Sequence, residues 1–179
     1  MATGSSRDTY QRIYEDFQWY GDGQQGRSPG VRLIPHFIDW IQSPVLDMGC
    51  GRGHTVEALR ERGLEATGID QITMHPDMRV GDITQPIEDM EQYRSIICID
   101  CIEHLTDEQV AGLFANMRRV ERQAFSIHNG PATGTGEDLH INIKSFDVWL
   151  QIIEECFEVE KIVDLQEEQK LYLTSTRTS

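Results

Sequence analysis

The sequence predicts an α/β protein built on a doubly wound, mostly parallel sheet of seven strands, with helices on both faces. Segments with strand character alternate with segments of helical periodicity along the chain. The continuous apolar run Ser95–Asp100 is typical of a parallel strand that is buried on both faces. Near the C-terminus, Phe157–Val163 and Lys170–Thr174 follow each other with no helix between them, so we expect two final strands there.

The first 41 residues contain two predicted helices with a glycine-rich stretch between them. Apolar residues at helical spacing predict amphipathic helices over Tyr10–Phe17 and Ile34–Ile41. The stretch Trp19–Gly30 between them is polar, with two aromatic residues at its start, and we interpret it either as a surface loop or as a lid over a ligand. We therefore divide the chain into a helix-and-lid segment, residues 1–30, and one globular unit, residues 31–179.

The remaining elements follow in order from the local patterns. An apolar pair at Val45 begins the first strand, and the helix His54–Arg62 ends at Gly63, where a helix C-terminal glycine belongs. Two strands come next, at Glu65–Asp70 and Met78–Val80.

Helix-start signals define the second half of the globular unit. Thr106 with Gln109 forms a capping box that opens a helix to about residue 120. Ala124–Ile127 is the fifth strand, and residues 130–137 form a flexible glycine-rich loop. Ser145 caps a helix whose buried stripe runs from Phe146 to Cys156.

The charge and composition of the chain exclude several classes of partner. With 30 acidic and 16 basic residues the net charge is −14, which disfavours long nucleic acids. We see neither an apolar run long enough to span a membrane nor a signal-peptide pattern. The four cysteines lack disulfide-type spacing and Cys98-x-x-Cys101 lacks a second pair, so we expect a cytoplasmic protein without structural zinc.

A glycine turn follows the first strand and predicts a nucleotide-type ligand. The pattern is Asp47-x-Gly49-x-Gly51-x-Gly53, without the G-x-G-x-x-G spacing of dinucleotide enzymes. A carboxylate before the turn is unfavourable beside a pyrophosphate and favourable beside an ammonium group. The next strand ends in Asp70, which is placed to bind ribose hydroxyls. These features favour S-adenosylmethionine, a sulfonium cofactor without phosphate.

Four stretches in this order resemble the class I, Rossmann-like S-adenosylmethionine-dependent methyltransferases over roughly residues 31–175. The resemblance implies that Asp47–Gly53 contacts the methionine part, that Asp70 and its neighbours bind the ribose and adenine, and that residues 81–83 bind the adenine. Asp100–Leu105 resembles the motif at the pocket mouth, and the final strand pair fits the antiparallel addition to the family's sheet. The cofactor-binding residues are then Asp47, Gly49, Cys50, Gly51, Gly53, Asp70, Gln71, Asp82, Ile83 and Asp100.

Three residues are candidates for catalysis at the acceptor. Glu103 and His104 follow the fourth strand, and His140 follows the flexible loop, so each could position or deprotonate an oxygen or nitrogen atom of a small molecule. His104 could equally be a structural histidine bonded to a loop backbone. The set, with Asp100, also resembles the metal-ligand pattern of small-RNA terminal 2′-O-methyltransferases and quinone-pathway O-methyltransferases. Asp100 stands where that pattern has a glutamate, so we do not favour a divalent metal.

The sequence leaves two alternatives to a small-molecule methyltransferase. One is a non-catalytic S-adenosylmethionine-binding or regulatory protein. The other is a metal-assisted 2′-O-methyltransferase of a nucleotide or an RNA end. Because the chain has little room for a separate substrate domain, short loops or a second copy in a homodimer must complete the acceptor site.

Overall fold

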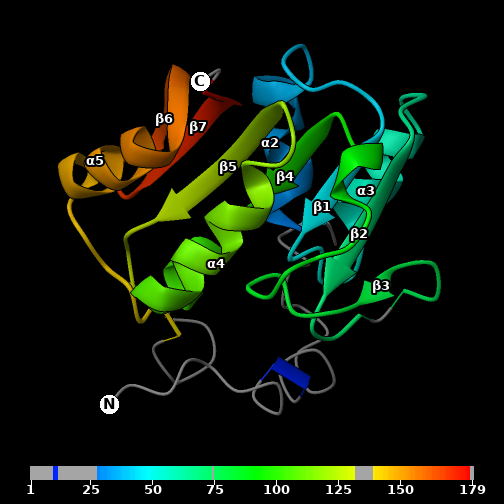
Figure 1. The fold of residues 1–179 in the computed structure, drawn as a ribbon, viewed down its shortest axis with the longest axis horizontal. Helices are drawn as coiled ribbons and strands as arrows, with labels where there is room; N and C mark the ends of the chain where they lie inside the picture. Colours follow the sequence, from blue (N-terminus) through cyan, green and yellow to red (C-terminus); the bar gives the residue numbers. More distant parts are fainter. Residues whose placement is uncertain (1–9, 12–27, 74, 132–138, 178–179) are drawn as a thin grey trace.

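A single seven-stranded sheet, in the order β3-β2-β1-β4-β5-β7-β6, forms the centre of the computed structural model, which describes residues 10–11, 28–73, 75–131 and 139–177 (Figure 1). The first five strands in this order are mutually parallel, and β7 runs antiparallel to both of its neighbours. The predicted fold class is therefore confirmed. The strands are β1 Val45–Met48, β2 Ala66–Asp70, β3 Arg79–Val80, β4 Ser95–Cys98, β5 Arg122–His128, β6 Phe157–Gln166 and β7 Gln169–Thr176.

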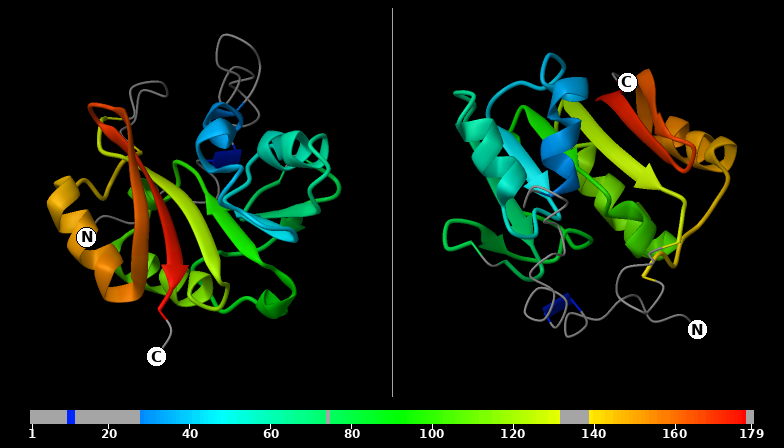
Figure 2. Two further views of the ribbon diagram at one scale, coloured as in Figure 1. Left: turned by 90° about the horizontal axis from the view of Figure 1, so that it is seen from above. Right: turned by 180° about the vertical axis from the view of Figure 1, so that it is seen from behind.

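Helices cover both faces of the sheet, as predicted (Figure 2). On one face, α2 and α3 pack through residues such as Phe37 and Leu59. On the other face, α4 and α5 pack through residues such as Phe114 and Trp149, which are fully buried. The helices are α2 Pro29–Phe37, α3 His54–Arg60, α4 Asp107–Met117 and α5 Phe146–Cys156, with short 3-10 helices η2 Met90–Gln92 and η3 Ile102–His104.

The predicted helix signals are present in the structure. The Thr106 hydroxyl accepts from the backbone N–H of Gln109, whose side chain accepts from the backbone N–H of Thr106. Gly63 has φ +82° after α3, and the following N–H of Leu64 bonds back to the carbonyl of Leu59, as in a glycine-terminated helix.

Several element boundaries differ from the sequence prediction. Helix α2 begins at Pro29, because a proline is favourable in the first turn of a helix, so the end of the expected loop is helical. Strand β4 stops at Cys98 instead of Asp100, because Asp100 adopts φ +50° and leaves the sheet. The last two strands are longer than predicted, and neither 3-10 helix was predicted.

Parts of the N-terminal and loop predictions fall outside the described residues. Of the predicted helix Tyr10–Phe17 only Tyr10 and Gln11 are described, and both are helical. Residues 12–27 and 132–138, which contain most of the two expected loops, are not described. Among the helices that the structure describes, none combines the length and the apolar character needed to cross a membrane.

Candidate functional site

A cavity of about 470 Å³ lies at the carboxyl ends of the parallel strands, where doubly wound sheets bind their ligands. Its volume falls in the range of about 300–1,000 Å³ that is typical of small-molecule sites. Twelve of the thirteen residues predicted from the sequence line it. They are Asp47, Gly49, Cys50, Gly51, Asp70, Gln71, Asp82, Ile83, Asp100, Glu103, His104 and His140.

The glycine turn packs tightly against the end of β4. Gly49 has φ +81°, and a side chain there would place its Cβ 2.7 Å from the Sγ of Cys101. Gly51 has φ +50°, and its N–H points at the carboxylate of Asp70. The predicted ligand residue Gly53 does not line the cavity: it is the left-handed N-cap of α3 and lies against Met78. Its role is to reverse the chain into the helix.

Two buried carboxyl groups lie beneath this turn. The carboxylate of Asp70 accepts hydrogen bonds from the N–H groups of Gly51 at 2.9 Å and Ile72 at 3.0 Å. Burial raises the pKa of Asp70, and these hydrogen bonds partly offset the increase. Burial, and then the charge of Asp70, raise the pKa of Asp47 to about 8. Asp47 is therefore mostly protonated at neutral pH when no ligand is bound.

The neighbouring Cys50 is not suited to nucleophilic chemistry. Its thiol is buried, and burial, followed by the charges of Asp47 and Asp70, raises its pKa. A thiol that stays protonated is a poor nucleophile. Cys50 is therefore best read as a small residue that packs in the turn, where it also lies close to Gly68.

Helix α4 positions the loop that contains Asp82. One oxygen of Asp82 accepts from both the N–H and the hydroxyl of Thr84, at 2.9 and 2.7 Å. The side chain of Asn116 donates to the carbonyls of Ile83 and Gln85 and accepts from a third backbone group in the loop, the N–H of residue 87. At Gly112 a Cβ would lie 2.2 Å from the Thr84 carbonyl oxygen, so only glycine lets the helix approach this closely.

On the opposite wall, Asp100 is held in an unusual backbone conformation by two polar side chains. Its N–H donates to the Ser126 hydroxyl at 2.9 Å, and the same hydroxyl donates to Asp100 Oδ1 at 2.6 Å. Gln169 Nε2 donates to that oxygen as well, also at 2.6 Å. A residue with φ +50° that is not glycine is strained, and such residues often occur at functional sites.

Glu103 is completely buried beside the cavity. Its Oε1 accepts a hydrogen bond from the N–H of His128 at 3.2 Å, while Oε2 has no hydrogen-bond partner among the described residues. Burial, followed by the charge of Asp100, raises the pKa of Glu103 well above its usual value. Burial therefore favours the neutral form of Glu103, in which a proton on Oε2 makes the side chain a hydrogen-bond donor.

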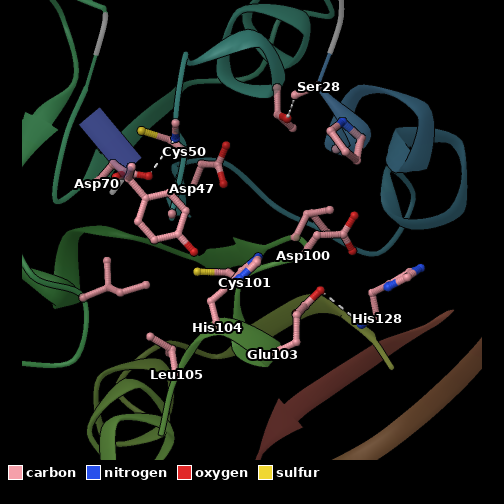
Figure 3. Close-up of a pocket in the computed structure, with 18 of the residues that line it drawn as sticks. Ser28, Asp47, Cys50, Asp70, Asp100, Cys101, Glu103, His104, Leu105 and His128 are labelled. Atoms are coloured by element: carbon pink, nitrogen blue, oxygen red, sulfur yellow. Dashed lines mark hydrogen bonds between the residues drawn. The ribbon is translucent and has the colours of Figure 1, made fainter. Parts of the chain in front are cut away.

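Two histidines, His104 and His128, lie beside this acid (Figure 3), and the ring of His140 lies close to both of their rings. The ring of His140 lies 4.8 Å from that of His104 and 5.2 Å from that of His128, measured between centroids. His104 Nδ1 bonds to the Leu139 carbonyl at 3.0 Å, and His140 Nδ1 bonds to the carbonyl of Gly130. A carbonyl can only accept, so both Nδ1 atoms carry the proton in the neutral rings, and each Nε2 is the basic nitrogen.

The same cluster brings together possible metal ligands. One ligand atom from each of Glu103, His104 and His140 lies within 4.8 Å of the others. Asp100, the fourth residue of the pattern noted in the sequence, has its Oδ1 engaged by Ser126 and Gln169.

The structure adds cavity residues that no sequence motif indicated. Tyr10 lines the cavity, and its ring stands edge-on to that of His104 at 5.8 Å. At the other end, Ser28 bonds to the side chains of His54 and Thr55 and joins the first turn of α2 to α3. Ser28-Pro29 before an apolar run is a helix-start signal that could have located this junction. Gln169 comes from the far end of the chain and has no local signal.

Comparison with protein families matches the part of the chain that carries the glycine turn, Asp70, Asp82 and the corner Asp100–Leu105. A family model described as a methyltransferase domain matches residues 28–121. The ubiquinone biosynthesis O-methyltransferase of Rickettsia bellii is 30% identical over 133 residues, which cover 61% of this chain and 55% of that protein. The enzyme of the same name from Pseudomonas entomophila is 30% identical over 112 residues, 50% of this chain and 48% of that protein. The chain thus spans about half the length of these curated relatives.

Solved structures share the fold at low sequence identity. A TehB-like S-adenosylmethionine-dependent methyltransferase from Corynebacterium glutamicum superposes with a TM-score of 0.68 at 16% identity, over 96% of this chain and all of that one. A protein from Pyrococcus horikoshii gives a TM-score of 0.70 at 16% identity, over 93% and 99% of the two chains. These likenesses confirm the class I methyltransferase fold.

Proposed function

The chain belongs to the methyltransferase-domain family, and we propose that it transfers the methyl group of S-adenosylmethionine to an oxygen or nitrogen atom of a small molecule. One observation carries the proposal. A single cavity is lined on one side by the glycine turn with Asp47, Asp70 and Asp82, and on the other by Glu103 and the histidine rings. A cofactor site and a proton-accepting site thus face the same space.

The cofactor side suits a ligand that is cationic and carries a nucleoside. Both oxygens of Asp70 already accept one backbone hydrogen bond, and each has a lone pair left for a ribose hydroxyl. Asp82 uses Oδ1 for Thr84, which leaves its other oxygen for the amino group of an adenine. The carboxylates of Asp70 and Asp82 would repel a pyrophosphate. When bound, S-adenosylmethionine supplies an electrophilic methyl group on a sulfonium.

The acceptor side suits the removal of a proton. The basic Nε2 atoms of His104 and His140 can accept the proton of an acceptor hydroxyl as the new bond forms, or that of an ammonium group before its nitrogen attacks. In its neutral form, which burial favours, Glu103 can donate a hydrogen bond from Oε2 that orients the acceptor. We therefore assign to Glu103 the positioning of the acceptor, because burial disfavours the charged form that could act as a base.

We favour a metal-free reaction over a metal-assisted one. A cation would fit between Glu103, His104 and His140, whose ligand atoms lie close together. It would require the buried Glu103 to ionise, against the loss of hydration that raises its pKa. The metal-assisted 2′-O-methyltransferase of an RNA end accordingly remains the less favoured alternative.

The names of the curated relatives direct the search for an acceptor. They are ubiquinone biosynthesis O-methyltransferases, so we propose a hydroxyl group on a small aromatic ring as the first class to test.

The four cysteines are all free in the structure, which supports our proposal of a cytoplasmic location. A homodimer that completes the acceptor site also remains a proposal.

Calorimetric titration with S-adenosylmethionine and S-adenosylhomocysteine tests the cofactor assignment. We expect both to bind at micromolar concentrations, and failure of both to bind at millimolar concentrations would refute it. Transfer of a labelled methyl group to a panel of hydroxylated aromatic acceptors then tests turnover. Binding without transfer to any acceptor, in a protein whose biological effect survives the His104→Ala and His140→Ala changes, would favour a regulatory role.

A further inference from the structure

We propose that Gln169 is a positioning residue, which together with Ser126 orients the carboxylate of Asp100 to receive the ammonium group of the cofactor's methionyl part. This inference rests on the proposed function. It gives the C-terminal hairpin, β6 with β7, a part in cofactor binding, although none of the cofactor motifs lies in it.

The hydrogen bonds at Asp100 leave one of its oxygens for a ligand. Ser126 and Gln169 both donate to Oδ1, each at 2.6 Å, whereas no hydrogen bond to Oδ2 is formed among the described residues. Asp100 is half-buried and lines the cavity, so Oδ2 is the oxygen that a ligand can reach. Two donors on one oxygen, with a third bond at the backbone N–H, hold the strained residue in a single orientation.

Gln169 is itself held in place by the way the hairpin packs on the segment after β5. It is the first residue of β7, lies opposite His128 in the antiparallel register and is only 7% exposed. In the hairpin turn, the Glu168 carbonyl accepts from the N–H of Asn129 at 2.7 Å. Gly130 has no room for a side chain, because its Cβ would meet the carboxylate of Glu168. The hairpin therefore presents the amide of Gln169 rigidly.

The chemistry of the two donors fits a cationic ligand. A hydroxyl and an amide are neutral, so they orient Asp100 without cancelling its negative charge, as a lysine or arginine would. The other acids near the glycine turn are less suited to this task. Asp47 is deeply buried, and Asp70 accepts the N–H groups of Gly51 and its own neighbour. Asp100 also lies next to Cys101, which contacts the turn itself.

Two nucleosides separate positioning of the ammonium group from a general structural role. S-adenosylhomocysteine carries the amino-acid group, and 5′-methylthioadenosine has the same adenosine and thioether without it. We expect the Gln169→Ala change to weaken S-adenosylhomocysteine about tenfold in calorimetric titrations. Affinity for 5′-methylthioadenosine should stay within about twofold of the wild type, because that ligand does not reach Asp100.

A second variant and a matched control complete the experiment. Ser126→Ala removes the other donor to the same oxygen and should produce the same selective loss. Gln166→Ala is the control, because Gln166 pairs with Gln169 across the hairpin and lines the cavity but is exposed and makes no hydrogen bond to Asp100 in the structure. It should keep the wild-type ratio of the two affinities.

The possible results are distinguishable. A loss confined to S-adenosylhomocysteine in both variants supports the inference. Equal losses for the two nucleosides, or no loss in either variant, would overturn it while leaving the proposed function intact. If the wild-type protein binds neither nucleoside, that result refutes the proposed function and this inference with it.

Discussion

Replacing Asp47 by asparagine should stabilise the ligand-free protein while it weakens cofactor binding. The pKa of this buried carboxyl rises from its ordinary value of 3.8 to about 8 in the folded chain. Between these two values the unfolded state has lost the proton and the folded state retains it. The unfolded state then binds fewer protons, so the free energy of unfolding falls as the pH rises through this window. Asparagine carries no such penalty.

The size of the effect follows from the same two pKa values. One pKa unit corresponds to about 1.4 kcal/mol, so the penalty is about 2 kcal/mol at pH 5 and about 4 kcal/mol at pH 7 as an upper limit. It stops growing above about pH 8, where the folded carboxyl ionises too. Imperfect packing of the asparagine offsets part of this difference. We therefore expect the free energy of unfolding to increase by about 1–3 kcal/mol at pH 7.

Urea unfolding at pH 5, 6, 7 and 8, without ligand, measures this difference. The stability advantage of Asp47→Asn should increase with pH, and the affinity for S-adenosylhomocysteine should fall in the same variant. Asp39→Asn is the matched control, because Asp39 is exposed and the change should have little effect at any of these pH values. An asparagine variant that is less stable than the wild type at pH 7, or whose advantage does not change with pH, would refute the reasoning.

Three further outcomes follow from the site. Gly112→Ala should cost about 3 kcal/mol in urea unfolding, because its Cβ would meet the Thr84 carbonyl, whereas Gly63→Ala, with open space around it, should cost about 1 kcal/mol; equal costs would contradict the close contact. His140→Ala should lower kcat about 100-fold without changing the Kd of S-adenosylhomocysteine, and an unchanged kcat would remove it from the reaction. EDTA should leave the rate unchanged, and a loss that added Mg²⁺ restores would identify the cluster as a metal site.

The predictions that held were those based on short-range patterns. They concern the glycine turn, the acid at the end of β2 and the capping box of α4. Each of these is defined by residues a few positions apart, which interact with each other within the same short segment. The candidate acceptor residues lie together because the carboxyl ends of parallel strands share one edge of the sheet. Twelve of the thirteen predicted site residues therefore line one cavity.

The residues that were missed act across long separations in the chain. Gln169 lies 69 positions from the aspartate it contacts, and Asn116 lies 31 to 33 positions from the carbonyls it binds. An amide side chain in a strand or helix is unremarkable in sequence, so nothing marks it as part of a site. The motif could not place Gly53 at the N-cap of α3, because a glycine that binds a ligand and one that caps a helix look the same in a motif.

The amide of Asn116 also has a consequence for how the protein opens. Its three hydrogen bonds join the C-terminal end of α4 to the loop that carries Asp82. The helix and the loop should then unfold together as one cooperative unit. A ligand that binds the loop should therefore reduce the local unfolding of both. In hydrogen exchange, the amides of Phe114 and Met117, which do not line the cavity, should become more protected when the nucleoside binds. Two helix residues that lie outside the cavity would thereby report that the site is occupied.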